Sequence, residues 1–321
     1  MNYVFLVVGF LLLIKGADFF VDGASSIAKK IGIPSVIVGL TVVSIGTSAP
    51  ELSVSLTSSL NGSNGLAVGN VLGSNIFNTL IVLGATAFVA PLIIKKKLVK
   101  IDLLVSLGVT ILLYLLVFVD ISFLGSSNFL SKIDGAVLIG VCIMYIIYLI
   151  YSSKKSNVDK EDNLRYKNVK VIPKLIFSII GVALIVIGGD LVVKCASDIA
   201  KTLGMSEKLI GLTIVAIGTS LPELVTSIVA AKKGENGIAI GNVLGSNIFN
   251  IVLILGLSSF IAPIAVAGPM AIDLIFLIIV TLVLVLSILL SKKDFKKISK
   301  REGILLIGIY IAYTVYIIIR N

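Results

Sequence analysis

The sequence predicts an all-α polytopic membrane protein of ten transmembrane helices, arranged as two inverted-topology repeats of five helices. Composition is the first reason: 57% of the 321 residues are hydrophobic and 14% are charged, whereas soluble domains are nearer a quarter charged. The hydrophobic residues also form solid runs instead of alternating, which favours membrane helices over a membrane β-barrel. Finally, the second half repeats the first at a constant offset of 172 residues, with 40 identities in 76 positions between 16–91 and 188–263.

Charged or Gly/Asn-rich breaks divide the hydrophobic runs into ten predicted spans. The first run lacks the basic start and small-residue cleavage site of a signal peptide, so we expect it to be retained as a helix. A hydrophilic stretch, 152–174, is expected to be a cytoplasmic linker between a first repeat, 1–151, and a second, 175–321. The predicted spans are 3–22, 35–60, 66–92, 101–119, 133–151, 175–193, 208–231, 237–262, 271–290 and 303–319.

The distribution of Lys and Arg predicts how these spans are oriented. If the N-terminus is outside, the linkers after the odd-numbered spans are cytoplasmic, and they carry 21 of the 27 basic residues. Cytoplasmic loops are normally enriched in Lys and Arg, so we expect both termini to be extracytoplasmic in a plasma (inner) membrane. The net charge of +10 then reflects orientation and contact with anionic lipid, and we expect no nucleic-acid partner.

Missing residue types exclude several kinds of chemistry. The chain has no histidine, which removes HExxH zinc sites, Ser-His-Asp triads and haem ligation by histidine. Cys142 and Cys195 each stand alone in a hydrophobic segment, so they indicate neither a disulfide framework nor a thiolate metal site. We therefore expect no cofactor and no enzymatic activity, and an intramembrane hydrolase is a weak alternative.

The motif GTSAPE lies in the middle of the second predicted span. Pro50 has no N–H to donate and its ring pushes against the preceding turn, so the helix should loosen around Ser44–Thr47. Carbonyl groups freed within a membrane must find a partner or line a watery cavity. Thr47 and Ser48 add hydroxyl oxygens beside them, and Glu51 adds a carboxylate one turn further on. The seventh span repeats this arrangement with Ala216, Thr219, Ser220, Pro222 and Glu223.

An odd number of spans separates the two copies, so the second copy is inserted upside down and the copies should meet near the membrane midplane. There they would form an all-oxygen site with two carboxylates. Hard cations such as Ca²⁺ take about 6–8 oxygen ligands, and the absence of His and paired Cys argues against zinc, copper or iron. The alternative is that each Glu is protonated and bonds a neighbouring helix. Two Glu at matched positions, each 18 residues before GNxxGSNxxN, favour the ion site.

The second motif, GNVLGSNIFN, is identical at 69–78 and 241–250. Its glycines permit close approach of helices or an irregular backbone. Its Ser and its last Asn are four residues apart and share a helix face. We expect these four residues to face the site: Ser74, Asn78, Ser246 and Asn250. The other asparagines stay open between structural hydrogen bonds and a role in the site: Asn70, Asn75, Asn242 and Asn247.

Taken together, the paired motifs at 39–78 and 211–250 resemble the α-repeats of the cation/calcium antiporter superfamily, specifically its prokaryotic sodium/calcium exchanger branch. The ten-span plan of that family covers essentially the whole chain. The resemblance implies a secondary antiporter that exchanges Na⁺ for Ca²⁺ by alternating access, with three Na⁺ or one Ca²⁺ competing for overlapping oxygens. It also implies that the first and sixth spans slide across the remaining bundle.

The resemblance implies a ligand set position by position. Glu51 and Glu223 would be the shared Ca²⁺ and Na⁺ ligands, and Asn250 departs from the pattern because a well-known member carries Asp there. Only two carboxylates then remain in the centre. The other implied ligands are the side chains of Thr47, Ser48, Thr219 and Ser220, the carbonyls of Ser44 and Ala216, and the side chains of Ser74, Asn78 and Ser246.

Two further transport functions remain as alternatives. In a proton/calcium antiporter the two Glu would release protons instead of Na⁺. The hydroxyl-rich motifs favour Na⁺, because Na⁺ needs extra neutral oxygens and a proton does not. A passive cation channel would conduct Ca²⁺ without any counter-ion gradient.

Overall fold

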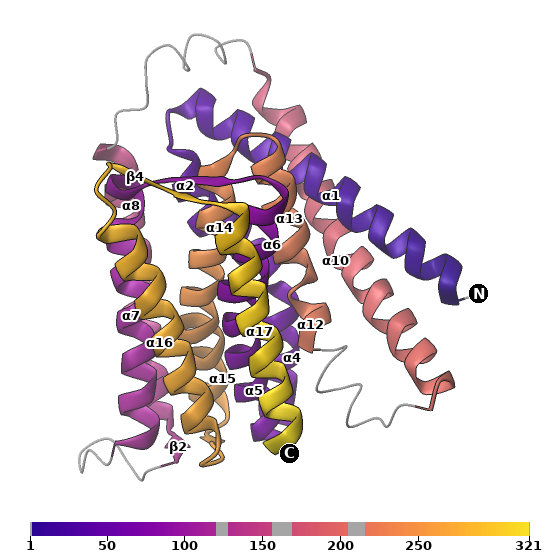
Figure 1. Cartoon of the computed structure of the whole chain (residues 1–321), viewed down its shortest axis with the longest axis vertical. Helices are drawn as coiled ribbons and strands as arrows, with labels where there is room; N and C mark the ends of the chain where they lie inside the picture. Colours follow the sequence, from indigo (N-terminus) through magenta and orange to yellow (C-terminus); the bar gives the residue numbers. More distant parts are fainter. Residues whose placement is uncertain (1, 120–127, 156–168, 205–215, 321) are drawn as a thin grey trace.

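The computed structural model describes residues 2–119, 128–155, 169–204 and 216–320. Within these ranges eight helices are long and apolar enough to cross a membrane, and the number is nine if two shorter pieces that meet at a bend of 49° are counted as one span. The seventh expected span, 208–231, is described only from Ala216 onward. The helices stand side by side as a bundle, which agrees with the expected polytopic membrane fold (Figure 1).

The first half contains two π-helical segments, labelled η, among its α-helices. Its elements are α1 (Asn2–Ile31), α2 (Ser35–Val38), η1 (Gly39–Val43), α3 (Ser44–Thr47), α4 (Ala49–Leu60), α5 (Asn64–Phe77), η2 (Asn78–Val82), α6 (Leu83–Val89), β1 (Leu92–Lys95), α7 (Lys96–Phe118), β2 (Phe129–Leu130) and α8 (Lys132–Lys155). The described elements of the second half are α10 (Val171–Thr202), α12 (Ala216–Thr219), α13 (Leu221–Lys232), α14 (Asn236–Phe249), η4 (Asn250–Leu255), α15 (Gly256–Ile261), β3 (Ile264–Ala265), α16 (Met270–Leu289), β4 (Phe295–Ile298) and α17 (Lys300–Arg320).

Several helices extend beyond the predicted spans. α1 continues nine residues past the predicted end at residue 22, so Lys29 and Lys30 lie in its last turn instead of in a linker. It runs on because no Pro or Gly interrupts the chain between Ala24 and Gly32, which has a left-handed φ of +74°. Both ends of the expected linker 152–174 are also helical, in α8 and α10, and its middle, 156–168, lies outside the described residues.

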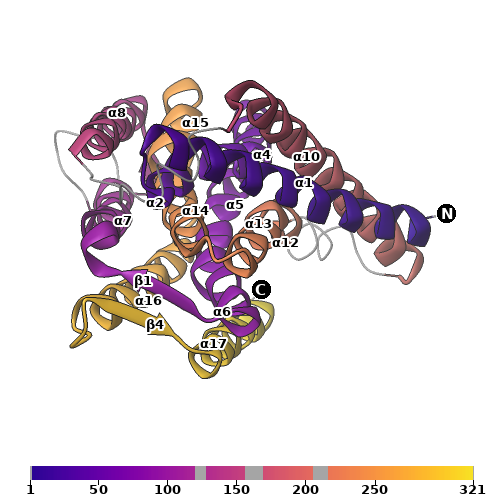
Figure 2. The same ribbon diagram turned by 90° about the horizontal axis from the view of Figure 1, so that it is seen from above.

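Glycines allow α1 and α10 to pack closely. A Cβ atom added to Gly16 would lie 2.7 Å from the carbonyl oxygen of Gly181, and one added to Gly188 would lie 2.8 Å from that of Gly9. Contacts this short leave no room for a side chain, so the two backbones touch directly. Figures 1 and 2 show the resulting pair, tilted along one flank of the bundle.

The centre of the bundle is built around α14. All of its residues from Ile238 to Phe249 are buried, and it packs against α2, η1 and α3. Added Cβ atoms on Gly241 and Gly245 would lie 2.5 Å from the carbonyl oxygen of Val36 and the Oγ of Ser44. The glycines of the second motif copy therefore permit the close approach that the sequence predicts. In the first copy the counterpart of the Val36 contact falls on position 208, outside the described residues.

Short two-stranded ladders lie at opposite ends of the bundle. β1 pairs antiparallel with β4, with Leu92 opposite Ile298, and β2 pairs antiparallel with β3. Figure 1 shows β4 at one end and β2 at the other. The helices that follow, α8 and α17, both begin with a reciprocal cap. In α8 the Ser131 N–H donates to Asp134 over 2.7 Å and the Asp134 N–H donates back to the Ser131 hydroxyl; Ser299 and Glu302 repeat the arrangement.

The segments that contain the two GTSxPE motifs pass through the bundle in opposite directions. In Figure 1 the path from α2 to α4 descends, whereas the path from α12 to α13 ascends. The bent span and the described part of its copy therefore enter the centre from opposite ends.

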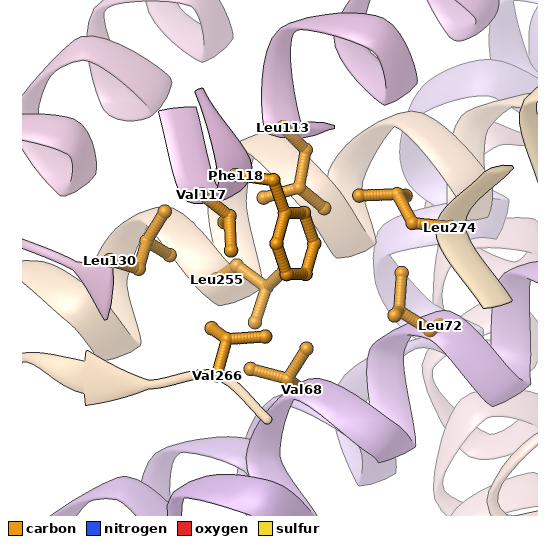
Figure 3. A pocket seen from close by; sticks show the side chains of 9 residues that line it. All are labelled: Val68, Leu72, Leu113, Val117, Phe118, Leu130, Leu255, Val266 and Leu274. Atoms are coloured by element: carbon orange, nitrogen blue, oxygen red, sulfur yellow. The ribbon is translucent and has the colours of Figure 1, made fainter. Parts of the chain in front are cut away.

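A small cavity of about 10 Å³ lies between α5, α7 and α16, near the end of the bundle that carries β2. Figure 3 shows the side chains that converge on it, all of which are apolar. Apolar cavities stay dry, and this one is barely large enough for a water molecule. Its lining residues are Val68, Leu72, Leu113, Val117, Phe118, Leu130, Leu255, Val266 and Leu274. This cavity therefore offers no ligand to an ion.

Candidate functional site

Both GTSxPE motifs break their helix at the serine. Ser48 lies between α3 and α4 with φ −84° and ψ 10°, and Ser220 lies between α12 and α13 with φ −92° and ψ 6°. Pro50 and Pro222 follow in the first turn of the next helix, where the missing N–H costs nothing. The loosened helix expected around the proline is thus present, and the break falls at Ser48, just after the expected Ser44–Thr47.

Glu51 lies in the first turn of α4 and its side chain is fully buried. Its Oε1 accepts a hydrogen bond from the Ser220 hydroxyl at 3.0 Å, and a longer one from the Ser74 hydroxyl at 3.4 Å. Ser74 comes from the motif that follows Glu51, whereas Ser220 comes from the other half of the chain. The carboxylate is therefore held by both halves.

Glu223 occupies the matching place in α13, and it is also fully buried. Its Oε1 accepts hydrogen bonds from the Ser48 hydroxyl at 2.9 Å and from the Ser246 hydroxyl at 3.2 Å. The two motif copies thus exchange serines, since each serine beside the helix break donates to the glutamate of the other copy. Four of the serines predicted to face the site do so: Ser48, Ser74, Ser220 and Ser246.

Neither carboxylate forms an ion pair with a basic residue of the described ranges. The second oxygen of each, Oε2, is buried without a hydrogen-bond partner. Each lies at the N-terminus of a helix, whose dipole favours negative charge, but an uncompensated carboxylate deep in a membrane still costs several kcal/mol. Two such groups side by side therefore require a cation or protons.

The remaining ligands available to a cation here are neutral. No group of three or more His, Cys, Asp or Glu in the described part of the chain is arranged to hold a metal ion. A cation between Glu51 and Glu223 would thus be surrounded by hydroxyl, amide and carbonyl oxygens. Such a donor set suits the hard cations Ca²⁺ and Na⁺.

Asn70 and its copy Asn242 brace the backbone beside the carboxylates. The Asn70 amide donates to the carbonyl oxygen of Glu51 at 3.3 Å and to the Ser55 hydroxyl at 3.0 Å. Asn242 makes the same two bonds in the second copy, at 3.2 and 2.9 Å. The structure thus gives these two asparagines, whose role the sequence left open, a supporting position. The matched pair Ser55 and Ser227 escaped notice, although the repeat itself would have marked it.

The motif threonines reach across to the same asparagines. The Thr47 Oγ1 lies 3.0 Å from the Oδ1 of Asn242, and the Thr219 Oγ1 lies 3.4 Å from the Oδ1 of Asn70. In both cases the hydroxyl is the donor, because the Oδ1 of an amide only accepts hydrogen bonds.

The carbonyl of Ser44 is one of the two expected carbonyl ligands. It accepts the N–H of Ser48 at 2.9 Å and the hydroxyl of Thr47 at 3.3 Å, so a bound ion would compete with the Thr47 hydroxyl for this oxygen. In the second copy the N–H of Ser220 bonds to the carbonyl of Ile217 at 3.2 Å.

Asn78 and Asn250 are buried at the first residues of η2 and η4, where the α-helices α5 and α14 turn into π-helices. π-Helical turns occur frequently at functional sites. The Oδ1 and Nδ2 of Asn78 and the Oδ1 of Asn250 lack a hydrogen-bond partner. Because α13 packs against η2 and α4 against η4, these free groups lie near the helices that carry the glutamates, although neither asparagine bonds a carboxylate.

One buried polar group beside the site has no counterpart in the first repeat. The Thr226 hydroxyl, nearly one turn after Glu223, is fully buried and has no hydrogen-bond partner. The matching residue is Val54, so the repeat gave no signal for it.

Comparison with known proteins agrees with this arrangement of paired carboxylates. The family model described as sodium/calcium exchanger protein matches residues 1–153 and 174–319. A putative antiporter, CaxA, of Alkalimonas amylolytica is 39% identical over 97% of this chain and 96% of its own length. The sodium/calcium exchanger MaX1 of Methanosarcina acetivorans is 34% identical, over 98% and 97%.

A solved structure of the sodium-calcium exchanger NCX_Mj, soaked with Na⁺ and Ca²⁺, superposes with a TM-score of 0.82 at 34% identity. The match covers 98% of this chain and 97% of that one. A family model that spans both halves, relatives of matching length and a shared fold all agree with the paired carboxylate motifs. This chain is a member of the sodium/calcium exchanger protein family.

Proposed function

We propose that this protein is a secondary active antiporter that exchanges Na⁺ for Ca²⁺ across the membrane by alternating access. The carrying observation is the pair of buried carboxylates, Glu51 and Glu223, each hydrogen-bonded to serines of both motif copies. The described residues place no basic side chain in an ion pair with either carboxylate. A transported cation supplies the missing positive charge.

The architecture that goes with this function is ten spans in two inverted five-helix repeats, 1–151 and 175–321, joined by the linker 152–174. The opposite directions of α2–α4 and α12–α13 support it, as do the matched glycine contacts and ladders of the two halves. The positive-inside bias of the loops supports a plasma (inner) membrane with both termini extracytoplasmic.

Exchange follows from competition for the same oxygens. One Ca²⁺ is neutralised by Glu51 and Glu223, and Na⁺ ions that occupy the same region share those carboxylates. Full occupancy by both ions would leave uncompensated positive charge in a medium of low dielectric constant, so binding of one displaces the other. The neutral ligands in this proposal are those of the motifs: Ser44, Thr47, Ser48, Ser74, Asn78, Ala216, Thr219, Ser220, Ser246 and Asn250.

The decisive experiment uses proteoliposomes that contain the purified full chain and are loaded with Na⁺. Radiolabelled Ca²⁺ is added outside, at equal pH on both sides, and uptake is compared with that into vesicles loaded with a large organic cation. We expect uptake only when the Na⁺ gradient is present. Because α1 and α10 are expected to move, uptake should also saturate with Ca²⁺ as a carrier does.

A proton/calcium antiporter is the alternative, and the same vesicles distinguish it. Uptake driven by a pH gradient and indifferent to Na⁺ would replace our proposal with that alternative. Uptake that follows the Ca²⁺ gradient without any counter-ion would instead identify a channel.

A further inference from the structure

A second polar cluster joins the two copies of GNVLGSNIFN beyond the carboxylates. The amide of Asn75 donates to the main-chain carbonyl of Asn247, its own copy in the other half, at 3.0 Å. The amide of Asn250 donates to the Oδ1 of Asn75, also at 3.0 Å. Thr79 closes the cluster, since its hydroxyl accepts from the Asn247 amide at 2.8 Å and donates to the Asn75 carbonyl at 2.8 Å. All four residues are at most 4% exposed.

The chemistry of the partners dictates how each amide is turned. A main-chain carbonyl only accepts hydrogen bonds, so Asn75 must present its Nδ2 to Asn247 and its Oδ1 to Asn250. That Oδ1 also only accepts, so Asn250 must present its own Nδ2. The Oδ1 of Asn250 is therefore turned away from Asn75, and it is buried without a partner. The orientation of the Asn250 amide is thus set by the Asn75 side chain of the opposite half, which is itself oriented by the main-chain carbonyl of Asn247.

We propose that Asn75 is a positioning residue that fixes the Asn250 amide so that its Oδ1 is presented to Na⁺ as a neutral oxygen ligand. This inference rests on the proposed exchange function and deepens it by naming what orients one of the neutral ligands. Before an ion binds, an unrestrained amide would also adopt the orientation in which its NH₂ faces the ion position, and turning it round would reduce the affinity for the cation. Fixing the amide removes that unfavourable orientation.

Na⁺ should depend on this orientation more than Ca²⁺ does. The two glutamates neutralise Ca²⁺ by themselves, whereas several Na⁺ ions spread over the centre need more neutral oxygens per unit of charge. Asn250 begins η4, which packs against α4, the helix that carries Glu51 in its first turn. Loss of the Asn75 contact should therefore weaken Na⁺ binding and leave Ca²⁺ binding largely unchanged.

The test is a double-mutant cycle between Asn75→Leu and Asn250→Leu, with the full chain in proteoliposomes. The concentration of Na⁺ that half-inhibits Ca²⁺ uptake and the KM for Ca²⁺ are measured for each variant. We expect Asn75→Leu to raise the half-inhibitory Na⁺ concentration about tenfold, because one buried hydrogen-bonded contact is lost. The KM for Ca²⁺ should change less than about twofold, and the double variant should be no worse than Asn250→Leu, because Asn75 acts only through Asn250.

Thr110→Val is the matched control. The Thr110 hydroxyl is also buried, but it bonds only the Ser106 carbonyl one turn earlier in α7. This variant should leave the half-inhibitory Na⁺ concentration and the KM for Ca²⁺ unchanged. Asn75→Ser is a second variant for the case in which Asn75→Leu fails to fold, since its short side chain cannot span both partners.

The outcomes separate this inference from the proposed function. If the wild type shows no Na⁺-driven uptake, the exchange function fails and this inference fails with it. If the wild type exchanges but the Asn75 variants change Na⁺ and Ca²⁺ equally, or add to the effect of Asn250→Leu, Asn75 merely supports the fold and only this inference is overturned. A selective, non-additive loss of Na⁺ affinity supports it.

Discussion

The hydroxyl of Ser48 donates a hydrogen bond to Glu223 over 2.9 Å, although the two residues are 175 positions apart in the chain. Ser220 and Glu51 form the reciprocal pair at 3.0 Å. Each repeat therefore completes the carboxylate site of the other, so neither repeat holds a whole site by itself. A cation bound at one glutamate would therefore lie next to a serine at the helix break of the opposite repeat.

Removal of either carboxylate charge should abolish Ca²⁺ transport. Glu51→Gln and Glu223→Gln keep the size of the side chain but leave one negative charge to face a divalent cation. We expect no Na⁺-driven Ca²⁺ uptake by either variant. Asp134→Asn is the control, because Asp134 caps α8 and its replacement should cost no more than about 1 kcal/mol of stability. Wild-type uptake by Glu223→Gln would refute the two-carboxylate site.

The exchanged serines should set Ca²⁺ affinity. Ser48→Ala removes the hydrogen bonds to Glu223 and to the Ser246 hydroxyl, and about 1–3 kcal/mol of binding should be lost when a buried carboxylate loses such a donor. The KM for Ca²⁺ uptake should rise roughly five- to a hundredfold. Ser59→Ala, which removes a buried hydroxyl that bonds only the Ser55 carbonyl, should leave the KM unchanged. Equal effects of both variants would mean that Ser48 acts through general packing.

Asn250→Asp should change ion affinity while exchange is retained. The substitution adds a third carboxylate on η4, which packs against the helix of Glu51, and an ionised Asp cannot donate to the Oδ1 of Asn75 as Asn250 does. Half-saturating concentrations of Na⁺ and Ca²⁺ in the uptake assay should therefore both shift from those of the wild type. Size-exclusion chromatography and thermal unfolding show whether the variant is folded; failure to fold would identify Asn250 as a structural residue instead.

The close packing of α1 and α10 should tolerate no side chain at its glycines. A Cβ atom at Gly188 would lie 2.8 Å from the carbonyl oxygen of Gly9 and 2.8 Å from the amide nitrogen of Leu13. Gly188→Ala should lower the unfolding temperature in detergent, with a loss of about 1–3 kcal/mol from overpacking.

Gly140→Ala is the matched control for this packing prediction. Gly140 lies within α8 and an added Cβ meets no atom of the described residues within 4 Å. Its replacement should be neutral or slightly stabilising, because Ala favours the helix by about 1 kcal/mol over Gly. If both alanine variants unfold at the wild-type temperature, the helices do not depend on this direct backbone contact.

Periodicity and composition predicted the helices well, but not their ends or irregularities. The expected bend near Pro50 is present because a missing N–H acts locally, within one turn. The π-helical turns that begin at Asn78 and Asn250 left no trace in the hydrophobic pattern. A π-helical turn inserts one residue into a buried helix without changing which of the neighbouring residues are apolar and which are polar. Hydropathy therefore does not reveal it.

The chain's sequence alone determined that this is a helical membrane protein with a repeated pair of carboxylate motifs, because hydropathy and repeat spacing are local or linear properties. It also identified both glutamates and the four serines that contact them. Only the tertiary structure decided that Ser48 serves Glu223 instead of Glu51, that Asn70 braces a backbone carbonyl, and that Asn75 orients Asn250. These contacts depend on how closely and at what angle the helices cross. Glycine contacts between distant backbones set that approach; the motif glycines predict that helices approach closely, but not which helices meet or at what angle.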